Sequence, residues 1–482
     1  MQKTIILFIA AFIGVTSLMA QDVSAWTLER CIDYAQKNNI STRQGELAIR
    51  NNELDIKQTQ LSRYPTVDAS VSTGLNFGRS IDRTTNTFSP GTSGFNSLSL
   101  SLGGVIYNGG RIENTIIQSK MEREASKADL EQTIQNLALT VATNYLQILL
   151  ADEQLLNAQK RIEQSKTQLA QMDKLIQAGI RPQNDRLDIL SLMARNDQTL
   201  VTAQNNVDLS YLNLKQAMNL DPATDMKVSK PNISMPNVSD SDGLTLSSVF
   251  GLAVGRQPQI KAGEFRQKAA EVGVRLARAG RLPTVSWFGN IGTNYSSLAQ
   301  DFSVTNIKDV PVPYKVIFPP STVPTTIFIL QDQQIPAFSK KGYFPQLGSN
   351  FGQGVGVSVS IPIYDQGRSN INEERARLNT MNIQQANQLV QNRLKNDIQV
   401  AIANARAAKK QFEASEKASL AAKGAYDNIE KKFKVGAANT FEYTTAKNTW
   451  DTTETDLIVS KYDYIFKLKV VDFYQGKKLS IN

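Results

Sequence analysis

The chain has 482 residues, of which 20% are charged; its formal net charge is +9, and it contains one cysteine and no histidine. Without histidine the chain lacks the commonest transition-metal ligand and general base, and its single cysteine, Cys31, cannot form an internal disulfide. Lysine and arginine are scattered along the chain, which argues against nucleic acid as a partner. With neither a Walker A loop nor a nucleophile elbow, the sequence predicts no catalytic residue, no metal site and no cofactor.

The N-terminus has the features of a secretory signal peptide, which we assign to residues 1–20. Lys3 supplies a positive charge, an apolar run follows from Thr4 to Leu18, and Ala20 precedes Gln21 at a small-residue cleavage site. The apolar run is too short to span a bilayer comfortably, and no second long apolar stretch follows it. The sequence therefore predicts a mature chain that crosses an inner membrane and carries no transmembrane helix.

The mature chain is an internal duplication, because a series of residues recurs in the same order and at constant spacing. In a first series, Thr27, Gly45, Glu53, Arg63 and Pro65 recur as Thr245, Gly263, Glu271, Arg281 and Pro283. In a second series, Tyr107, Gly110, Arg111 and Gly179 recur as Tyr364, Gly367, Arg368 and Gly436. We divide the chain into a first repeat (21–220), a linker (221–243) and a second repeat (244–482). The second repeat is longer because it contains a Pro-rich segment, about 296–349, that we expect to be a long outer loop.

Each repeat is predicted to begin with a helix, from Leu28 to about Leu61 and from Leu246 to about Gly280. Two strands follow in each repeat, because apolar residues alternate there with polar or small ones. The alternating segments begin at Val67, Leu98, Val285 and Val355. This alternation puts one face of the strands against an apolar environment and the other against water. Taken alone, it favours a half-buried soluble sheet over strands that face lipid.

A very long helix is predicted from Ile112 to Ala178, where the sequence has neither proline nor glycine. At 1.5 Å per residue this helix is about 100 Å long. Its apolar positions recur every seven residues, which requires left-handed supercoiled packing against neighbouring helices. Gly179 and Gly436 are placed to end the long helix of each repeat in the left-handed conformation, and a return helix follows each.

Two repeats supply four strands, and four strands cannot close a sheet in lipid. An open sheet edge in hydrocarbon leaves backbone groups without hydrogen-bond partners, and the smallest closed sheets in membranes have about eight strands. If these strands span a membrane, the chain must therefore associate with itself. The residues alone allow either a dimer or a trimer.

The sequence resembles the TolC family of outer-membrane efflux and secretion channels over essentially all of the mature chain. The resemblance is carried by Trp26-Thr27-Leu28-Glu29, by the strand starts at Tyr64-Pro65 and Leu282-Pro283, by the strand-to-helix turns Tyr107–Arg111 and Tyr364–Arg368, and by the helix ends at Gly179 and Gly436. It implies a mixed α and transmembrane β fold, in which a homotrimer forms a twelve-stranded β-barrel, four strands per chain, that continues into a long α-helical coiled-coil tunnel.

The resemblance also implies a place and a role. The protein would lie in the cell outer membrane, in contact with its lipid, with the tunnel in the periplasm. It would be the passive export duct of a tripartite efflux or type I secretion system, docked to a periplasmic adaptor (membrane fusion) protein and an inner-membrane pump. The alternative function is a periplasmic coiled-coil scaffold or adaptor protein with a soluble β-sheet.

A passive duct needs a gate, and the ends of the helical hairpins are the natural place for it. The resemblance implies an acidic ring there that favours cations, and it places Glu442 at the position of the gate carboxylate. In the first repeat Asp185 and Asp188 lie on one helical face with Arg181 close by. The alternative reading makes all four ordinary solvated residues or partners of a helix dipole. The candidate contacts for the adaptor are Ala178, Gly179, Ile180, Val435, Gly436 and Ala437.

Overall fold

A computed structural model of the chain describes residues 25–81, 88–230, 245–320 and 322–477. The predicted signal peptide and most of the predicted linker lie outside these residues. No helix among the described residues is long and apolar enough to cross a membrane. The chain divides into two units, each made from both repeats. The helical unit comprises Met1–Leu54, Lys120–Ala270 and Asn379–Asn482, and the sheet unit comprises Asp55–Ser119 and Glu271–Leu378.

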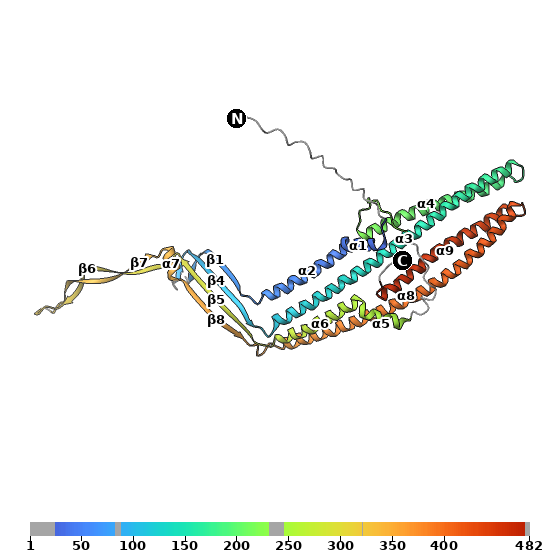
Figure 1. Ribbon diagram of the computed structural model, residues 1–482. Helices are drawn as coiled ribbons and strands as arrows, with labels where there is room; N and C mark the ends of the chain where they lie inside the picture. The colour runs from blue at the N-terminus through green and yellow to red at the C-terminus, as the bar shows by residue number, and fades with distance from the viewer. Residues whose placement is uncertain (1–24, 82–87, 231–244, 321, 478–482) are drawn as a thin grey trace, which may run out of the picture. The chain divides into compact units, whose positions relative to one another are not determined.

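The two repeats form the same series of helices (Figure 1). The first repeat contains α1 (Leu28–Asn38), α2 (Ile40–Leu61), α3 (Arg111–Gln177) and α4 (Asn184–Met218), and the second contains α5 (Leu246–Arg256), α6 (Pro258–Ala279), α8 (Arg368–Lys434) and α9 (Thr440–Tyr474). Corresponding helices have equal lengths of 11, 22, 67 and 35 residues. The duplication that the sequence predicts is therefore present in the fold.

The prediction of a single opening helix in each repeat is wrong, because the chain breaks into two helices. Asn39 and Gln257 have extended backbones, with ψ of 135° and 122°, and each still donates its N–H to the last turn of the preceding helix. In the second repeat the following residue is Pro258, the first residue of α6. Proline is favoured at that position because the first helical N–H has no partner within the helix.

The main sheet has four antiparallel strands in the order β1-β4-β5-β8. The strands are β1 (Thr66–Asn76), β4 (Ser93–Tyr107), β5 (Thr284–Ser296) and β8 (Gly352–Ser360). The pairing brings the apolar members of all four alternating segments to one face, as in the pairs Val67↔Leu102 and Val285↔Val359. This apolar face is open in the single chain: Val355 on β8 is 85% exposed. The opposite face carries mainly serine, as in the pair Ser70↔Ser99.

The Pro-rich segment 296–349, which we expected to be a long outer loop, contains regular structure. It forms a hairpin of β6 (Gln300–Val316) and β7 (Thr325–Lys340), followed by the short helix α7 (Tyr343–Ser349). A second, smaller hairpin joins β2 (Arg79–Ile81) to β3 (Phe88–Pro90). At the base of the long hairpin the buried amide of Gln346 accepts from Ser296 N (2.9 Å) and donates to Ser296 O (3.0 Å) and Lys341 O (2.8 Å). These bonds tie the end of β5 to the end of the hairpin.

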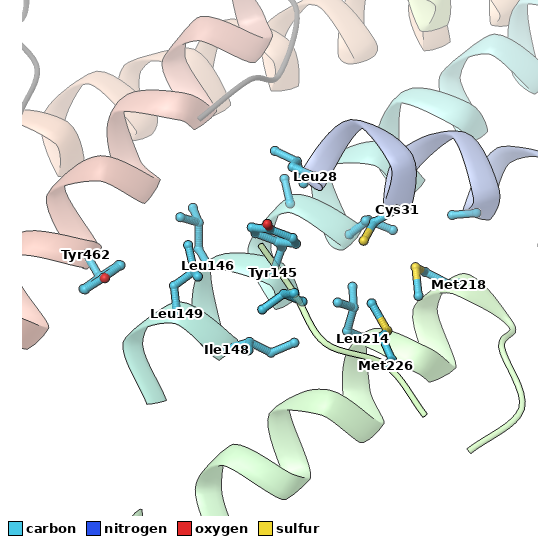
Figure 2. Packing of buried hydrophobic residues seen from close by; sticks show 14 of the residues in the cluster. Leu28, Cys31, Tyr145, Leu146, Ile148, Leu149, Leu214, Met218, Met226 and Tyr462 are labelled. Carbon is cyan, nitrogen blue, oxygen red and sulfur yellow. The ribbon is translucent and has the colours of Figure 1, made fainter. Parts of the chain in front are cut away.

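Two hydrophobic clusters lie in the helical unit; the first is built mainly from the first repeat and also includes Tyr462 and Ile465 of α9. In the first, Cys31 of α1 packs with Tyr145 and Ile148 of α3 and with Leu214 and Met218 of α4, and all five are almost fully buried (Figure 2). Burial raises the pKa of the Cys31 thiol to about 12, so this side chain acts as a small apolar group. The second cluster joins α5, α8 and α9. Its largest fully buried members are Leu394 and Ile398.

Candidate functional site

Both long helices end in the same glycine turn. In the first repeat, Gly179 N donates to Ile176 O (2.9 Å) and Ile180 N donates to Leu175 O (2.9 Å). In the second, Gly436 N donates to Phe433 O and Ala437 N to Lys432 O. This pair of bonds defines a Schellman motif, which needs a left-handed residue after the helix. Gly179 and Gly436 supply it with φ of 71° and 79°, and open space surrounds both.

The predicted docking residues lie together at these two turns and are exposed. Ile180 and Val435 are 66% and 79% exposed, although both are large apolar side chains. Leu187 and Phe441, at the starts of α4 and α9, are similarly exposed. Each hairpin therefore ends in an uncovered apolar tip. The role of these residues in docking stays a prediction.

Arg181 connects the two tips. Its guanidinium donates a hydrogen bond to Ala438 O (3.1 Å) and lies 4.7 Å from the centre of the Phe433 ring. Its Nη1 is also 3.7 Å from a carboxylate oxygen of Asp185, one helical turn further along. The Arg181 and Asp185 side chains are only 15% and 17% exposed. The first-repeat turn is thus bonded to the second-repeat turn, and the Asp185 carboxylate is occupied within its own hairpin.

The other two gate candidates do not join this contact. Glu442 forms a capping box at the start of α9: its carboxylate accepts from Asn439 N (3.1 Å), and Glu442 N donates to Asn439 Oδ1 (2.8 Å). A carboxylate at this place satisfies a free N–H and faces the positive end of the helix dipole. Asp188 is exposed on α4. No hydrogen bond or ion pair links Glu442 or Asp188 to Arg181 within the described residues.

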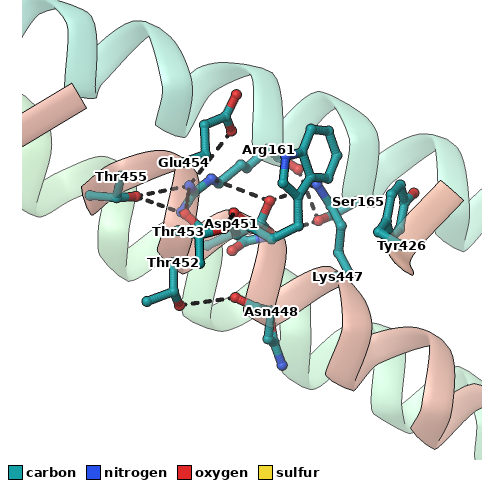
Figure 3. Close-up of polar contacts among 12 residues, drawn as sticks. Arg161, Ser165, Tyr426, Lys447, Asn448, Asp451, Thr452, Thr453, Glu454 and Thr455 are labelled. Atoms are coloured by element: carbon teal, nitrogen blue, oxygen red, sulfur yellow. Dashed lines mark hydrogen bonds and ion pairs between the residues drawn. The ribbon is translucent and has the colours of Figure 1, made fainter. Parts of the chain in front are cut away.

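Sequence reasoning missed a buried charge cluster where α3 meets α9 (Figure 3). Lys447 is 2.7 Å from the Asp451 carboxylate, and its ammonium lies 4.3 Å from the Trp450 ring centre. From α3, Arg161 Nε is 3.6 Å from the same carboxylate, and Arg161 Nη2 donates to Thr455 Oγ1 at 2.9 Å. Only the spacing of Lys447 and Asp451, four residues apart, could have indicated the pair.

A groove of about 890 Å³ separates the hairpins of the two repeats near their tips. One wall carries Met172 and Leu175 of α3, and the other carries Tyr426 of α8 and Tyr443 and Trp450 of α9. The hydroxyls of Tyr426 and Tyr443 are hydrogen-bonded at 3.0 Å, and burial raises the pKa of Tyr443, so both stay neutral donors and acceptors. Lysine, glutamate and glutamine side chains line the groove beside these apolar ones.

A duplicated chain with an exposed apolar sheet face and long paired helices has the architecture of an outer-membrane channel protein. The chain belongs to the outer membrane efflux protein family, whose model matches residues 31–220 and 249–466. This family consists of channels and not enzymes, which agrees with the prediction that no catalytic residue is to be found. Family membership also confirms the predicted location in the outer membrane.

Individual relatives are distant. Outer membrane protein TolC of Escherichia coli (strain K12) is 27% identical over 191 residues, which cover 38% of each chain. The pyoverdine export outer membrane protein OpmQ of Pseudomonas putida is 27% identical over 182 residues, or 37% of each chain. The aligned part of this chain thus spans well under half of either relative.

Two solved structures superimpose on nearly the whole of this chain. CusC superimposes with a TM-score of 0.71 at 15% identity, covering 94% of this chain and 92% of that one. VceC of Vibrio cholerae gives a TM-score of 0.69 at 13% identity, covering 93% and 96%. These likenesses confirm the predicted fold class.

Proposed function

We propose that three copies of this chain form a passive export duct across the outer membrane, as part of a tripartite efflux or type I secretion system. The observation that carries the proposal is the four-stranded sheet, which combines an uncovered apolar face with unpaired outer edges at β1 and β8. An uncovered apolar face is stable against lipid, but free edges in lipid are not. Pairing β8 of one copy with β1 of the next removes both edges and gives a closed sheet of twelve strands.

The helices supply the periplasmic part of the duct. Helices α3 and α8 have 67 residues each, about 100 Å, and the seven-residue repeat suits them to a supercoiled wall. At the tips, Arg181 holds the two hairpins of one chain together. Release of this contact lets the hairpins separate, so that the wall opens. Glu442 and Asp188 place negative charge near the starts of α9 and α4 and favour the entry of cations.

The tips also supply the contact with the periplasmic adaptor protein. Ile180 and Val435 are uncovered apolar residues at the ends of both hairpins, and burying them against a partner removes apolar surface from water. The inner-membrane pump then delivers substrate through the adaptor. The duct itself needs no chemistry for this role.

The test of the duct is oligomeric state and conductance of the full-length protein. We expect a trimer by native mass spectrometry after detergent extraction from membranes, and ion conductance in planar bilayers. A monomer recovered from the soluble periplasmic fraction would instead support a periplasmic scaffold with a soluble sheet.

The test of docking is the double variant Ile180→Ser/Val435→Ser, with Leu420→Ser as control. Leu420 is equally exposed, at 73%, but lies on α8 away from the turn. We expect the double variant to lose export activity in cells while its trimer and its bilayer conductance stay unchanged. Equal export by the double variant and the control would contradict docking at the tips.

A further inference from the structure

The junctions between strands and helices in the sheet unit are rich in arginine. An arginine stands at each of the four: Arg63 just before β1, Arg111 at the start of α3, Arg281 just before β5, and Arg368 at the start of α8. Further arginines follow in the adjoining helices, at positions 275, 278, 375 and 377. The same segments (58–66, 103–119, 271–284 and 361–378) contain no lysine. The junctions are therefore selective for the guanidinium group and not only for positive charge.

The acidic residues at the junctions do not neutralise these arginines. Glu373, whose side chain is only 7% exposed, contacts Arg278 (2.8 Å), Arg281 (2.7 Å) and Arg377 (2.8 Å). One carboxylate thus serves three guanidinium groups and leaves a surplus of positive charge. Each guanidinium has five N–H donors in a planar fork, so all three keep donors that point elsewhere.

Four other arginines are free to bind a ligand. Arg111, Arg275, Arg368 and Arg375 are exposed, and none makes an ion pair among the described residues. Arg63 differs from Arg278, Arg281 and Arg377, which share Glu373, because it forms a separate ion pair with Glu113 at 2.5 Å.

Exposed tyrosines accompany the arginines at three of the four junctions. Tyr64 precedes β1, Tyr107 ends β4, and Tyr364 follows β8, where it is 85% exposed. Tyrosine prefers the boundary between hydrocarbon and water, because its ring is apolar and its hydroxyl is polar. The apolar face of the sheet ends at this level. The tyrosine rings and the guanidinium groups therefore lie where the apolar face of the sheet ends. This is the arrangement expected of a protein segment at the headgroup layer of a bilayer.

We propose that the junction belt, defined as Arg111, Arg275, Arg281, Arg368 and Arg375, binds the phosphodiester headgroups of glycerophospholipids in the inner leaflet of the outer membrane. The inference rests on the proposed function, in which the sheet crosses that membrane. The guanidinium fork matches two phosphate oxygens at once, which a lysine ammonium cannot do. Glu373 holds Arg281 together with Arg278 and Arg377, so that several guanidinium groups gather where the strands end. Bound headgroups then fix the depth of the sheet in the bilayer.

The test compares two triple variants of the full chain. In the belt variant, Arg111, Arg275 and Arg368 are each changed to Gln. In the control variant, Arg43, Arg195 and Arg393 are changed to Gln; these are exposed arginines of the helical unit, and none makes an ion pair among its described residues. Native mass spectrometry measures phospholipid retained after purification. We expect the belt variant to retain several-fold less phospholipid than the wild type, and the control to retain the wild-type amount. A belt variant with each arginine changed to Lys should recover only part of the difference.

Depth in the bilayer is measured separately through Trp287 of β5. The chain has three tryptophans, so Trp26→Phe/Trp450→Phe leaves Trp287 as the single fluorophore. In vesicles of phosphatidylcholine with phosphatidylglycerol, brominated acyl chains should quench Trp287, and the belt variant should change the bromine position that quenches best.

The outcomes distinguish the lipid-binding proposal from the export-duct proposal. If Trp287 is quenched but the belt and control variants retain equal amounts of phospholipid, the lipid-binding proposal is wrong and the export-duct proposal is unaffected. If Trp287 is not quenched in any variant, the sheet is outside the bilayer and both proposals fall. If inorganic phosphate displaces the retained lipid at millimolar concentration, the site takes free phosphate and the assignment to lipid is overturned.

Discussion

The guanidinium of Arg181 donates a hydrogen bond to the carbonyl oxygen of Ala438, 3.1 Å away, and so joins the turn of one helical hairpin to the turn of the other. The bond links the two repeats at the position where the proposed gate must move. Its acceptor is a main-chain oxygen, so the contact depends on the course of the α8–α9 turn and not on the side chain at position 438. The nearby ring of Phe433 shields the guanidinium from solvent and adds a cation–π contact.

Removal of this contact should open the proposed gate. We expect Arg181→Gln to raise the conductance of the closed channel several-fold in planar bilayers, because the hairpins lose their bond at the tip. The matched control is Arg186→Gln, since Arg186 pairs with Asp173 within the same hairpin at 2.9 Å. If both variants conduct like the wild type, the contact does not restrain the gate.

Two substitutions at Glu442 separate its structural role from its proposed electrostatic one. Glutamine can still cap the N–H of Asn439, so Glu442→Gln should leave thermal stability close to wild type while weakening cation preference. Glu442→Ala removes the cap as well and should cost about 0.5–1 kcal/mol of stability. Reversal potentials in a salt gradient measure selectivity, and thermal unfolding in detergent measures stability. Unchanged selectivity in both variants would leave Glu442 as a helix cap only.

The tip glycines are required by backbone conformation. Gly179→Ala and Gly436→Ala should each cost about 1–2 kcal/mol, because alanine is strained at positive φ even where space is open. Gly424→Ala provides the contrast: Gly424 lies within α8, its φ is not positive, and no atom would meet an added Cβ. That substitution should stabilise the protein by up to about 1 kcal/mol. Thermal unfolding of the three variants measures these changes in stability. Equal shifts of the unfolding temperature in all three would contradict the argument from backbone conformation.

The buried cluster at Asp451 should be sensitive to the loss of the Asp451 carboxylate. Asp451→Asn leaves the buried Lys447 ammonium without its ion-pair partner, while Arg161 keeps only the more exposed Glu454 at 3.9 Å, and we expect a loss of about 3 kcal/mol. Lys447→Met should cost less, because Arg161 still neutralises Asp451 and methionine fills the space beside Trp450. Chemical denaturation of the purified protein measures both, and the order of the two losses is the decisive result.

Acid should loosen the junction around Glu373. Hydrogen bonds from Arg278 and Arg377 lower the pKa of Glu373 from 4.5 to about 2. Because the folded pKa is depressed, the stabilisation is complete above about pH 4.5 and is lost as the pH falls toward 2. We expect unfolding followed by circular dichroism to show this loss in the wild type and a flatter profile in Glu373→Gln. Glu374→Gln, at the neighbouring exposed residue, should keep the wild-type profile.

Local patterns in the sequence predict most of this fold. The long helix expected from Ile112 to Ala178 spans Arg111–Gln177, and the four alternating segments form the four strands of the main sheet. Both features depend on the periodicity of neighbouring residues. The Gln257-Pro258 pair is a local signal for the helix break that the expectation of one opening helix leaves out. The β6–β7 hairpin depends on pairing across a long segment, which the proline content does not indicate.

The site was less predictable, because its contacts join residues far apart in the chain. Arg181 follows Gly179 by two residues and so lies near the tip, but its acceptor lies in the other repeat and has no local signal. From the sequence, Glu442 is expected to be either a helix-start residue or a gate residue; its hydrogen bond to the N–H of Asn439 is seen in the structure. The pairing of Arg161 with Asp451 spans most of the chain and has no local signal.

The amide of Gln346 joins the end of β5 to the end of β7 through hydrogen bonds to main-chain atoms of Ser296 and Lys341. These bonds at the base of the long hairpin do not depend on the side chains of residues 300–340. The sequence from 300 to 340 is therefore free to lengthen, shorten or change its surface while the channel wall keeps its geometry. The part of the protein that would face the surroundings can diversify independently of the part that conducts.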